Sequence, residues 1–236
     1  MISVIIPSIR PENLEETIKK FIISQGWDCV FEIVLVTDFD IDYKIWVNRY
    51  CDVKVIKIPR NGPTDAICKG IEASKGEYIF FINDQCSVSP NGLSKMLAFS
   101  KKHNDRVIVG HRNTPITPMK YFGVDFEPYP FIHKDLVKEL GGYYRPEYKH
   151  FYADPDLAMR SSWLDIPIKK CPGVSVHRTC DGSMDYQGHV ESVNKNYKND
   201  METFINRWKF LGKPFKEISP GKRSWLWCRL LELMPY

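Results

Sequence analysis

The sequence predicts an α/β fold with a mostly parallel sheet flanked by helices. In the first 110 residues, short apolar stretches of strand length alternate with stretches whose apolar residues follow the spacing of one helix face. The short stretches are apolar at consecutive positions, as is usual for parallel strands that are covered on both faces. This alternation favours a parallel sheet with helices on both sides.

The expected elements follow in order along the chain. Strands are expected over residues 3–6, 32–36, 53–58, 77–82 and 107–109. Helices are expected to open at Pro11, to cover residues 41–50 and 66–71, and to surround residues 93–97.

The second half has a different pattern. Residues 111–130 are rich in Pro, Tyr and Phe without a clear period, which indicates a long functional loop. A short helix over 134–140 is expected to end at Gly141-Gly142, and a strand over 174–177 precedes a long helix over about 190–211.

Polar, turn-forming segments follow four of the predicted strands. They are residues 7–10, 37–40, 60–65 and 83–87. Because ligands of open α/β sheets bind outside the carboxyl ends of the strands, we expect the binding site there.

Composition excludes several classes of protein. The 236 residues are 43% hydrophobic and 26% charged, which argues against disorder. Net charge is only +4, from 33 basic and 29 acidic residues, so a dedicated nucleic-acid binder is not expected. The seven cysteines form no CxxC motif, which favours reduced thiols and a cytoplasmic location. The opening residues predict a strand rather than a signal peptide, and no apolar run approaches the ~20 residues that span a bilayer.

The order of several short motifs resembles glycosyltransferase family 2, which has the GT-A fold. The first strand reads ISVIIPS, a later strand ends in Val36-Thr37-Asp38, and residues 73–85 read ASKGEYIFFINDQ. The second half adds Gly141-Gly142, the segment DPDLAMR over 154–160, and a strand that ends at His177. The resemblance covers about residues 1–180. It implies one domain over 1–212, with a nucleotide-sugar half (1–110) and an acceptor half (111–212), followed by an amphipathic tail (213–236).

The resemblance also implies roles for individual residues. It assigns Asp38 to the base of the nucleotide, where a carboxylate would accept the uracil N3–H; a helix cap is the alternative for Asp38. The residues expected at the nucleotide and its phosphates are Pro7, Ser8, Arg10, Asp38, Asn61, Lys69, Asn83 and Asp84. Gln85 and His177 stand where the family would carry a divalent metal, Mn or Mg.

Two positions depart from the family's acidic DXD motif. Asn83 and Gln85 stand where that motif has carboxylates, and Asp84 lies between them. Neutral amide oxygens are poorer ligands for a hard dication than carboxylates. The sequence therefore predicts a weakened metal site or none. If no metal binds, the leaving-group charge must be met by basic side chains or backbone N–H groups.

Asp154 is the first candidate for the general base, and Asp156 is the reserve. Pro155 would suit the first helical position, which would place Asp154 at the N-cap of a helix. A purely structural cap is the competing interpretation. Arg160, one turn after Asp156, could pair with it.

The leading hypothesis is an inverting transferase that moves a sugar from a nucleotide sugar to a glycan or lipid-linked hydroxyl. A UDP-sugar is the favoured donor. The alternative is a catalytically weak or inactive relative that binds nucleotide or glycan as a scaffold. Aromatic residues of the loop could stack on sugars or simply pack the loop: Tyr121, Phe122, Phe126, Tyr129 and Phe131. The tail, with Trp225, Trp227 and nearby basic residues, would suit peripheral contact with the inner membrane surface, docking on the domain, or a homodimer.

Overall fold

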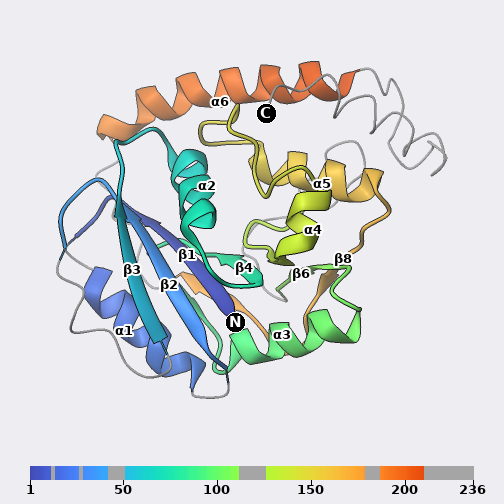
Figure 1. Ribbon diagram of the computed structural model, residues 1–236. Coiled ribbons are helices and arrows are strands. Elements are labelled where there is room, and N and C mark those ends of the chain that lie inside the picture. The colour runs from blue at the N-terminus through green and yellow to red at the C-terminus, as the bar shows by residue number, and fades with distance from the viewer. Residues whose placement is uncertain (12–13, 27–28, 42–50, 112–125, 179–186, 210–236) are drawn as a thin grey trace.

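The sheet at the centre of the molecule has seven strands in the order β3-β2-β1-β4-β7-β6-β8 (Figure 1). The computed structural model describes residues 1–11, 14–26, 29–41, 51–111, 126–178 and 187–209. Neighbouring strands pair in parallel except at β7, which is antiparallel to β4 and β6. The prediction of a mostly parallel α/β sheet is therefore confirmed. The strands are β1 (Ile2–Ser8), β2 (Phe31–Thr37), β3 (Cys51–Lys57), β4 (Tyr78–Phe81), β6 (Ile108–Gly110), β7 (Phe131–His133) and β8 (Ile168–Lys170).

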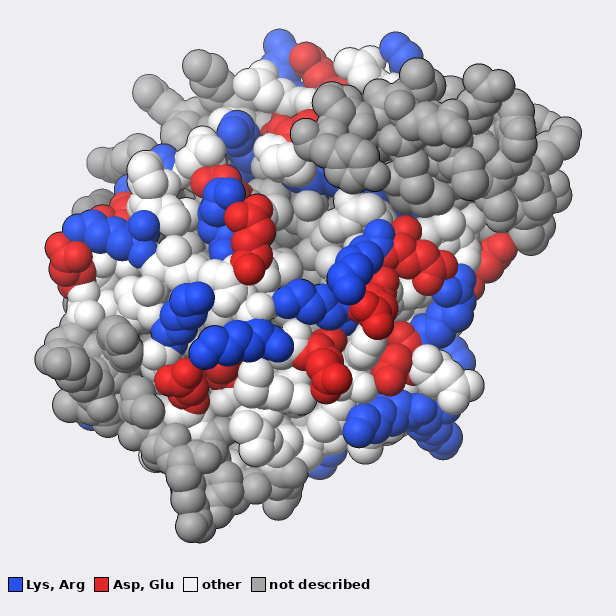
Figure 2. All heavy atoms as spheres, viewed as in Figure 1, with Lys and Arg blue, Asp and Glu red and all other residues white. Residues whose placement is uncertain are grey.

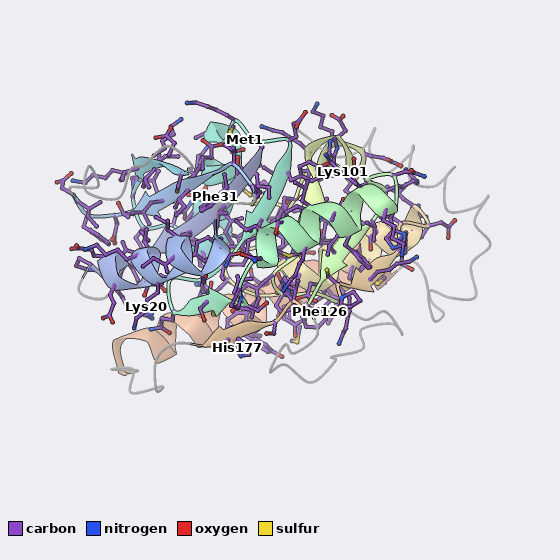
Figure 3. All side chains as sticks on the ribbon, turned by 90° about the horizontal axis from the view of Figure 1, so that it is seen from below. Met1, Lys20, Phe31, Lys101, Phe126 and His177 are labelled. Carbon is purple, nitrogen blue, oxygen red and sulfur yellow. The ribbon has the colours of Figure 1, made fainter. Side chains whose placement is uncertain are left out.

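Helices cover both faces of this sheet. α1 (Leu14–Gln25) and α3 (Gly92–Lys102) lie side by side over one face (Figures 1 and 3). On the other face, a long helix, α6, lies across α2 and α5 at the top of Figure 1. The helices of this second layer are α2 (Pro63–Ala73), α4 (Lys134–Glu139), α5 (Ala153–Trp163) and α6 (Gln187–Trp208). β5 (Cys86–Val88) and β9 (Val176–Arg178) form a separate antiparallel pair.

Successive residues of β1 belong alternately to two hydrophobic cores, one on each face of the sheet. Val4 and Ile6 belong to the core beneath α1 and α3, whereas Ile5 belongs to the core beneath α2 and α5. Gly70 lets α2 approach the sheet closely, because a Cβ there would lie 2.5 Å from Cγ2 of Ile5. This close packing fixes the start of α2 beside the ends of β1 and β2.

The predicted elements are recovered with small boundary shifts where the structure describes them. The three-residue strands β5, β7 and β8 were not predicted, because a strand that short has too few positions for a pattern. The helix expected over 41–50, Tyr121, Phe122 and the tail over 213–236 lie outside the described residues.

Surface features of the described part are unremarkable in two respects. None of its helices has both the length and the apolar character needed to cross a bilayer. Among the residues coloured in Figure 2, basic and acidic side chains are interspersed over the face shown. This face therefore carries no extended field of a single sign in its coloured part.

A buried ion-pair network joins α5 to α6. The Asp156 carboxylate, which is 0% exposed, accepts hydrogen bonds from Arg160 Nε (2.8 Å), Arg207 Nη1 (3.2 Å), Trp208 Nε1 (3.0 Å) and Tyr148 Oη (3.1 Å). Burial acts to raise the pKa of Asp156, but Arg160 and Arg207 outweigh it and lower that pKa below its ordinary value. Asp156 is therefore an ionised structural residue that holds α6 against α5.

We expect Asp156→Asn to lower the free energy of unfolding by about 3–5 kcal/mol, because it leaves two guanidinium groups without their buried counter-charge. Urea unfolding followed by circular dichroism measures the change. Asp135→Asn is the matched control, since Asp135 pairs with Lys138 on the surface and should cost less than about 1 kcal/mol. Equal losses in the two variants would contradict a structural role for Asp156.

Candidate active site

A cavity of about 770 Å³ opens at the carboxyl ends of β1, β2 and β4. Parallel strands bring the chain segments that follow them to one edge of the sheet, so residues distant in sequence meet there. The predicted site residues that line this cavity are Pro7, Ser8, Arg10, Asp38, Asn61, Asn83, Asp84, Gln85 and Asp154.

Three predicted site residues lie elsewhere. Asp156 is buried in the α5–α6 network and does not line the cavity, so the reserve choice of a base there is not supported by its position. Lys69 lies exposed on α2, with its Nζ 2.9 Å from Glu72. His177 is exposed on β9, hydrogen-bonded through Nε2 to the Ser175 hydroxyl (2.6 Å), and Figure 3 shows it away from the sheet in which Phe31 lies.

The strand ends of the cavity carry two ion pairs. Asp84, after β4, accepts a hydrogen bond from the Ser8 hydroxyl (2.7 Å), and its other oxygen lies 3.6 Å from Arg10 Nη1. Asp38, after β2, accepts a hydrogen bond from Arg60 Nε at 2.9 Å. Both carboxylates are thus matched by a guanidinium in the absence of ligand.

The start of α2 forms another part of the lining. Gly62 is the N-cap with φ at 94°, and its turn lies so close to the Lys149 carbonyl that a side chain at position 62 would overlap it. Pro63 follows at the start of the helix, where a missing N–H costs nothing. The N-cap makes no side-chain hydrogen bond, so the positive end of the α2 dipole faces the cavity without a side-chain cap.

Asp154 enters the cavity from α5, in a different way from the predicted one. The helix begins at Ala153 with Tyr152 as N-cap in the left-handed region, so Asp154 lies inside the first turn and its prediction as N-cap is wrong. The Asp154 carboxylate accepts a hydrogen bond from the Tyr144 hydroxyl. Burial raises the pKa of Asp154 to about 7, although the Tyr144 hydrogen bond acts in the opposite direction.

Helix α6 stabilises the turn before α5. Asp200, which is 1% exposed, accepts hydrogen bonds from three consecutive backbone N–H groups, those of Lys149 (3.0 Å), His150 (2.8 Å) and Phe151 (2.8 Å). One turn earlier on α6, Asn196 lines the cavity itself. The last helix therefore supplies and braces one wall of the site.

A second buried carboxyl lies behind the wall that Tyr129 forms. Glu127 accepts hydrogen bonds from the backbone N–H groups of His111 (3.1 Å) and Tyr129 (3.3 Å), and burial raises its pKa to about 7. The Tyr129 hydroxyl accepts a hydrogen bond from Asn83 Nδ2 at 2.9 Å. Of the predicted aromatic loop, Tyr129 lines the cavity, whereas Phe131 is a core residue of β7.

A family model, Glycosyl transferase family 2, matches residues 3–158. The chain belongs to glycosyl transferase family 2. The match includes β1, β2, β4, α2 and the start of α5, which form the cavity together with α6. A comparison with curated protein sequences found no significant match.

Solved structures give the same fold for this family 2 chain. It is similar to S. aureus TarS with a TM-score of 0.61 at 16% identity, over 98% of this chain and 42% of that one. TarS 1-349 in complex with UDP-GlcNAc matches with a TM-score of 0.53 at 15% identity, over 88% of this chain and 72% of that one. GalNAc-T7 with UDP, GalNAc and Mn²⁺ matches with a TM-score of 0.58 at 16% identity, over 87% and 50%. This chain thus spans less than half the length of the longer TarS chain.

Several lining residues of this family 2 chain were not singled out from the sequence. They are Thr64, Tyr144, Lys149, His150, Phe151 and Asn196. Two of them have a local signal: Thr64 lies in the polar segment 60–65 after a predicted strand, and Tyr144 follows the predicted Gly141-Gly142 turn. The others reach the site through packing of α5 and α6.

We expect Asp154→Asn to stabilise the protein at pH 8. The pKa of an unfolded aspartate is about 3.9 and that of folded Asp154 about 7, so between these values the folded chain holds a proton that the unfolded chain has lost. Raising the pH through this window therefore lowers the stability of the wild type but not of the variant. The difference should reach up to about 4 kcal/mol at pH 8 and vanish near pH 4.

Urea unfolding at a series of pH values measures this difference. Asp52→Asn, an exposed position on β3, is the control and should follow the wild-type curve. A wild type as stable as Asp154→Asn at pH 8 would contradict the raised pKa of Asp154.

Proposed function

We propose that the chain transfers a sugar from a UDP-sugar to a hydroxyl group of a glycan or lipid-linked acceptor, with inversion at the anomeric carbon. The observation that carries this proposal is Asp154, a half-buried carboxyl with a raised pKa in the lining that also contains the strand-end aspartates Asp38 and Asp84. A carboxyl with a pKa near 7 suits a general base that works at neutral pH. Synthesis of a polysaccharide or another glycan is the corresponding role.

The donor would lie across the strand ends. Asp38 at β2 would accept the N3–H of uracil, and the diphosphate would lie between the end of β1 and the start of α2, where Arg10 and the helix dipole favour negative charge. The choice of uridine is supported by neighbours of the same fold whose structures contain UDP or UDP-GlcNAc.

The reaction would be a single displacement. The acceptor oxygen forms a bond to the anomeric carbon as the bond from that carbon to the diphosphate oxygen breaks, and the acceptor proton passes to Asp154. The nucleophile enters on the face opposite the leaving group, so the configuration inverts. Tyr144 would hold the Asp154 carboxylate in position through its hydrogen bond.

Asp154→Asn should lower kcat for sugar transfer by roughly 10²–10⁴-fold, because Asn cannot take the acceptor proton. The affinity for UDP should change by less than about twofold, since Asn keeps the shape of the side chain and can still accept the Tyr144 hydrogen bond. Transfer assays with a panel of nucleotide sugars and calorimetric titration with UDP measure the two quantities. Full transferase activity in this variant would rule out Asp154 as the base.

Tyr144→Phe should move the acidic limb of the pH–rate profile to higher pH. The lost hydrogen bond lowers the pKa of Asp154 in the wild type, so its removal raises that pKa. We expect kcat to fall roughly three- to tenfold at pH 6 and to approach the wild-type value above pH 8. A uniform loss at all pH values would show that Tyr144 acts in some other way.

A non-catalytic scaffold that binds nucleotide or glycan is the second candidate. It is favoured by Asn83 and Gln85, which replace carboxylates expected by resemblance to the family. UDP binding without turnover of any nucleotide sugar, with or without manganese, would establish this alternative.

A further inference from the structure

We propose that Arg10, rather than a divalent cation, meets the negative charge of the donor diphosphate, so that this site binds its donor without metal. The inference rests on the proposed function and deepens it. Two independent observations support it. The described residues of the site offer few metal ligands, and Arg10 is held in the cavity by contacts with Ser8 and Asp84.

The ligands present do not fit a Mn²⁺ or Mg²⁺ site. Asp84 is the only carboxylate of residues 83–85, and both of its oxygens already face protein partners. Asn83 donates its amide N–H to Tyr129, and His177 lies outside the cavity lining. Within the described part of the chain, no three His, Cys, Asp or Glu side chains gather closely enough to hold a metal ion. Hard dications prefer several carboxylate oxygens, and the described residues of this site do not supply them.

Arg10 is anchored to Asp84 through both its backbone and its side chain. The Arg10 N–H donates to the Ser8 hydroxyl (3.2 Å), and that hydroxyl donates to Asp84 Oδ2 (2.7 Å). The Arg10 guanidinium lies 3.6 Å from Asp84 Oδ1, and the two side chains are 27% and 12% exposed. These contacts with the protein already order the Arg10 side chain, so less conformational entropy is lost when the donor binds.

The position of Arg10 also distinguishes it from the other basic residues of the lining. It follows β1, which lies between β2 with Asp38 and β4 with Asp84. The Arg60 side chain is more exposed than that of Arg10 and pairs with Asp38. Lys149 Nζ lies 3.4 Å from Asn61 Oδ1. Of the basic residues in the described lining, Arg10 is thus the one that follows the strand between those of Asp38 and Asp84, where the diphosphate of a donor laid across the strand ends would lie.

A guanidinium can replace the bridging role of a metal. It is charged at all working pH values and directs donors along more than one edge, so it can contact Asp84 and phosphate oxygens at once. The N-terminus of α2, without a side-chain cap, adds positive potential to the same cavity. When the sugar–diphosphate bond breaks, both would stabilise the charge that grows on the leaving oxygen.

Calorimetric titration of UDP and uridine, each in EDTA and in Mn²⁺, tests the proposal. The wild type should bind UDP in EDTA with an affinity within about threefold of that in Mn²⁺. Arg10→Met should weaken UDP binding in EDTA by about tenfold or more and leave uridine binding nearly unchanged, because uridine has no phosphate. Arg10→Lys should recover only part of the UDP affinity, since a point charge cannot contact two groups in the same way. Lys20→Met, which removes an exposed cation on α1, is the matched control.

The results that overturn the proposal are distinct from those that overturn the proposed function. Wild-type UDP binding that is lost in EDTA and restored by Mn²⁺ would reject Arg10 as the substitute for a metal while leaving the transferase intact. UDP binding by Arg10→Met in EDTA at wild-type strength would also reject it. If neither UDP nor a nucleotide sugar binds in any condition, both proposals fail. Thermal unfolding of each variant checks its fold, and Arg10→Lys carries the test if Arg10→Met is unstable.

Discussion

The common direction of β1, β2 and β4 is the constraint on which the rest of the site depends. Because these strands run parallel, the chain must leave all three at the same edge, and their following residues are forced together. Ser8, Asp38 and Asp84 meet in one cavity for this reason. The second half of the chain then needs only to place α5 against that edge to complete a site with residues from both halves of the chain.

Two aspartates in the first turn of α5 show how the neighbouring side chains determine the pKa of a carboxyl group. Asp156 is fully buried and Asp154 is half-buried, and the pKa of Asp154 is raised to about 7 whereas that of Asp156 is lowered. Asp154 meets a neutral phenol, whereas Asp156 meets two guanidinium groups. Only the carboxyl without a cationic partner keeps the near-neutral pKa that proton transfer at physiological pH requires.

The sequence predicted the sheet and its binding edge well, because strand periodicity and strand-end polarity are local signals. It ranked Asp154 above Asp156 and indicated the pairing of Arg160 with Asp156, but it could not reveal the second guanidinium, that of Arg207, some 50 residues away along the chain. His177 was predicted at the site through its place at a strand end, but β9 pairs with β5 outside the main sheet. Asn196 and the turn at Lys149 were missed because packing by α6, rather than any local pattern, brings them to the cavity.

The hold of Asp200 on residues 149–151 has a consequence for how the protein is made. The contact joins segments about 50 residues apart, and its acceptor lies near the end of the described domain. A nascent chain could pair β1, β2 and β4 long before α6 leaves the ribosome, but the far wall of the pocket would still be unsupported. The pocket would therefore be completed only after α6 has been synthesised, and fragments that end before α6 would retain a sheet without a finished pocket.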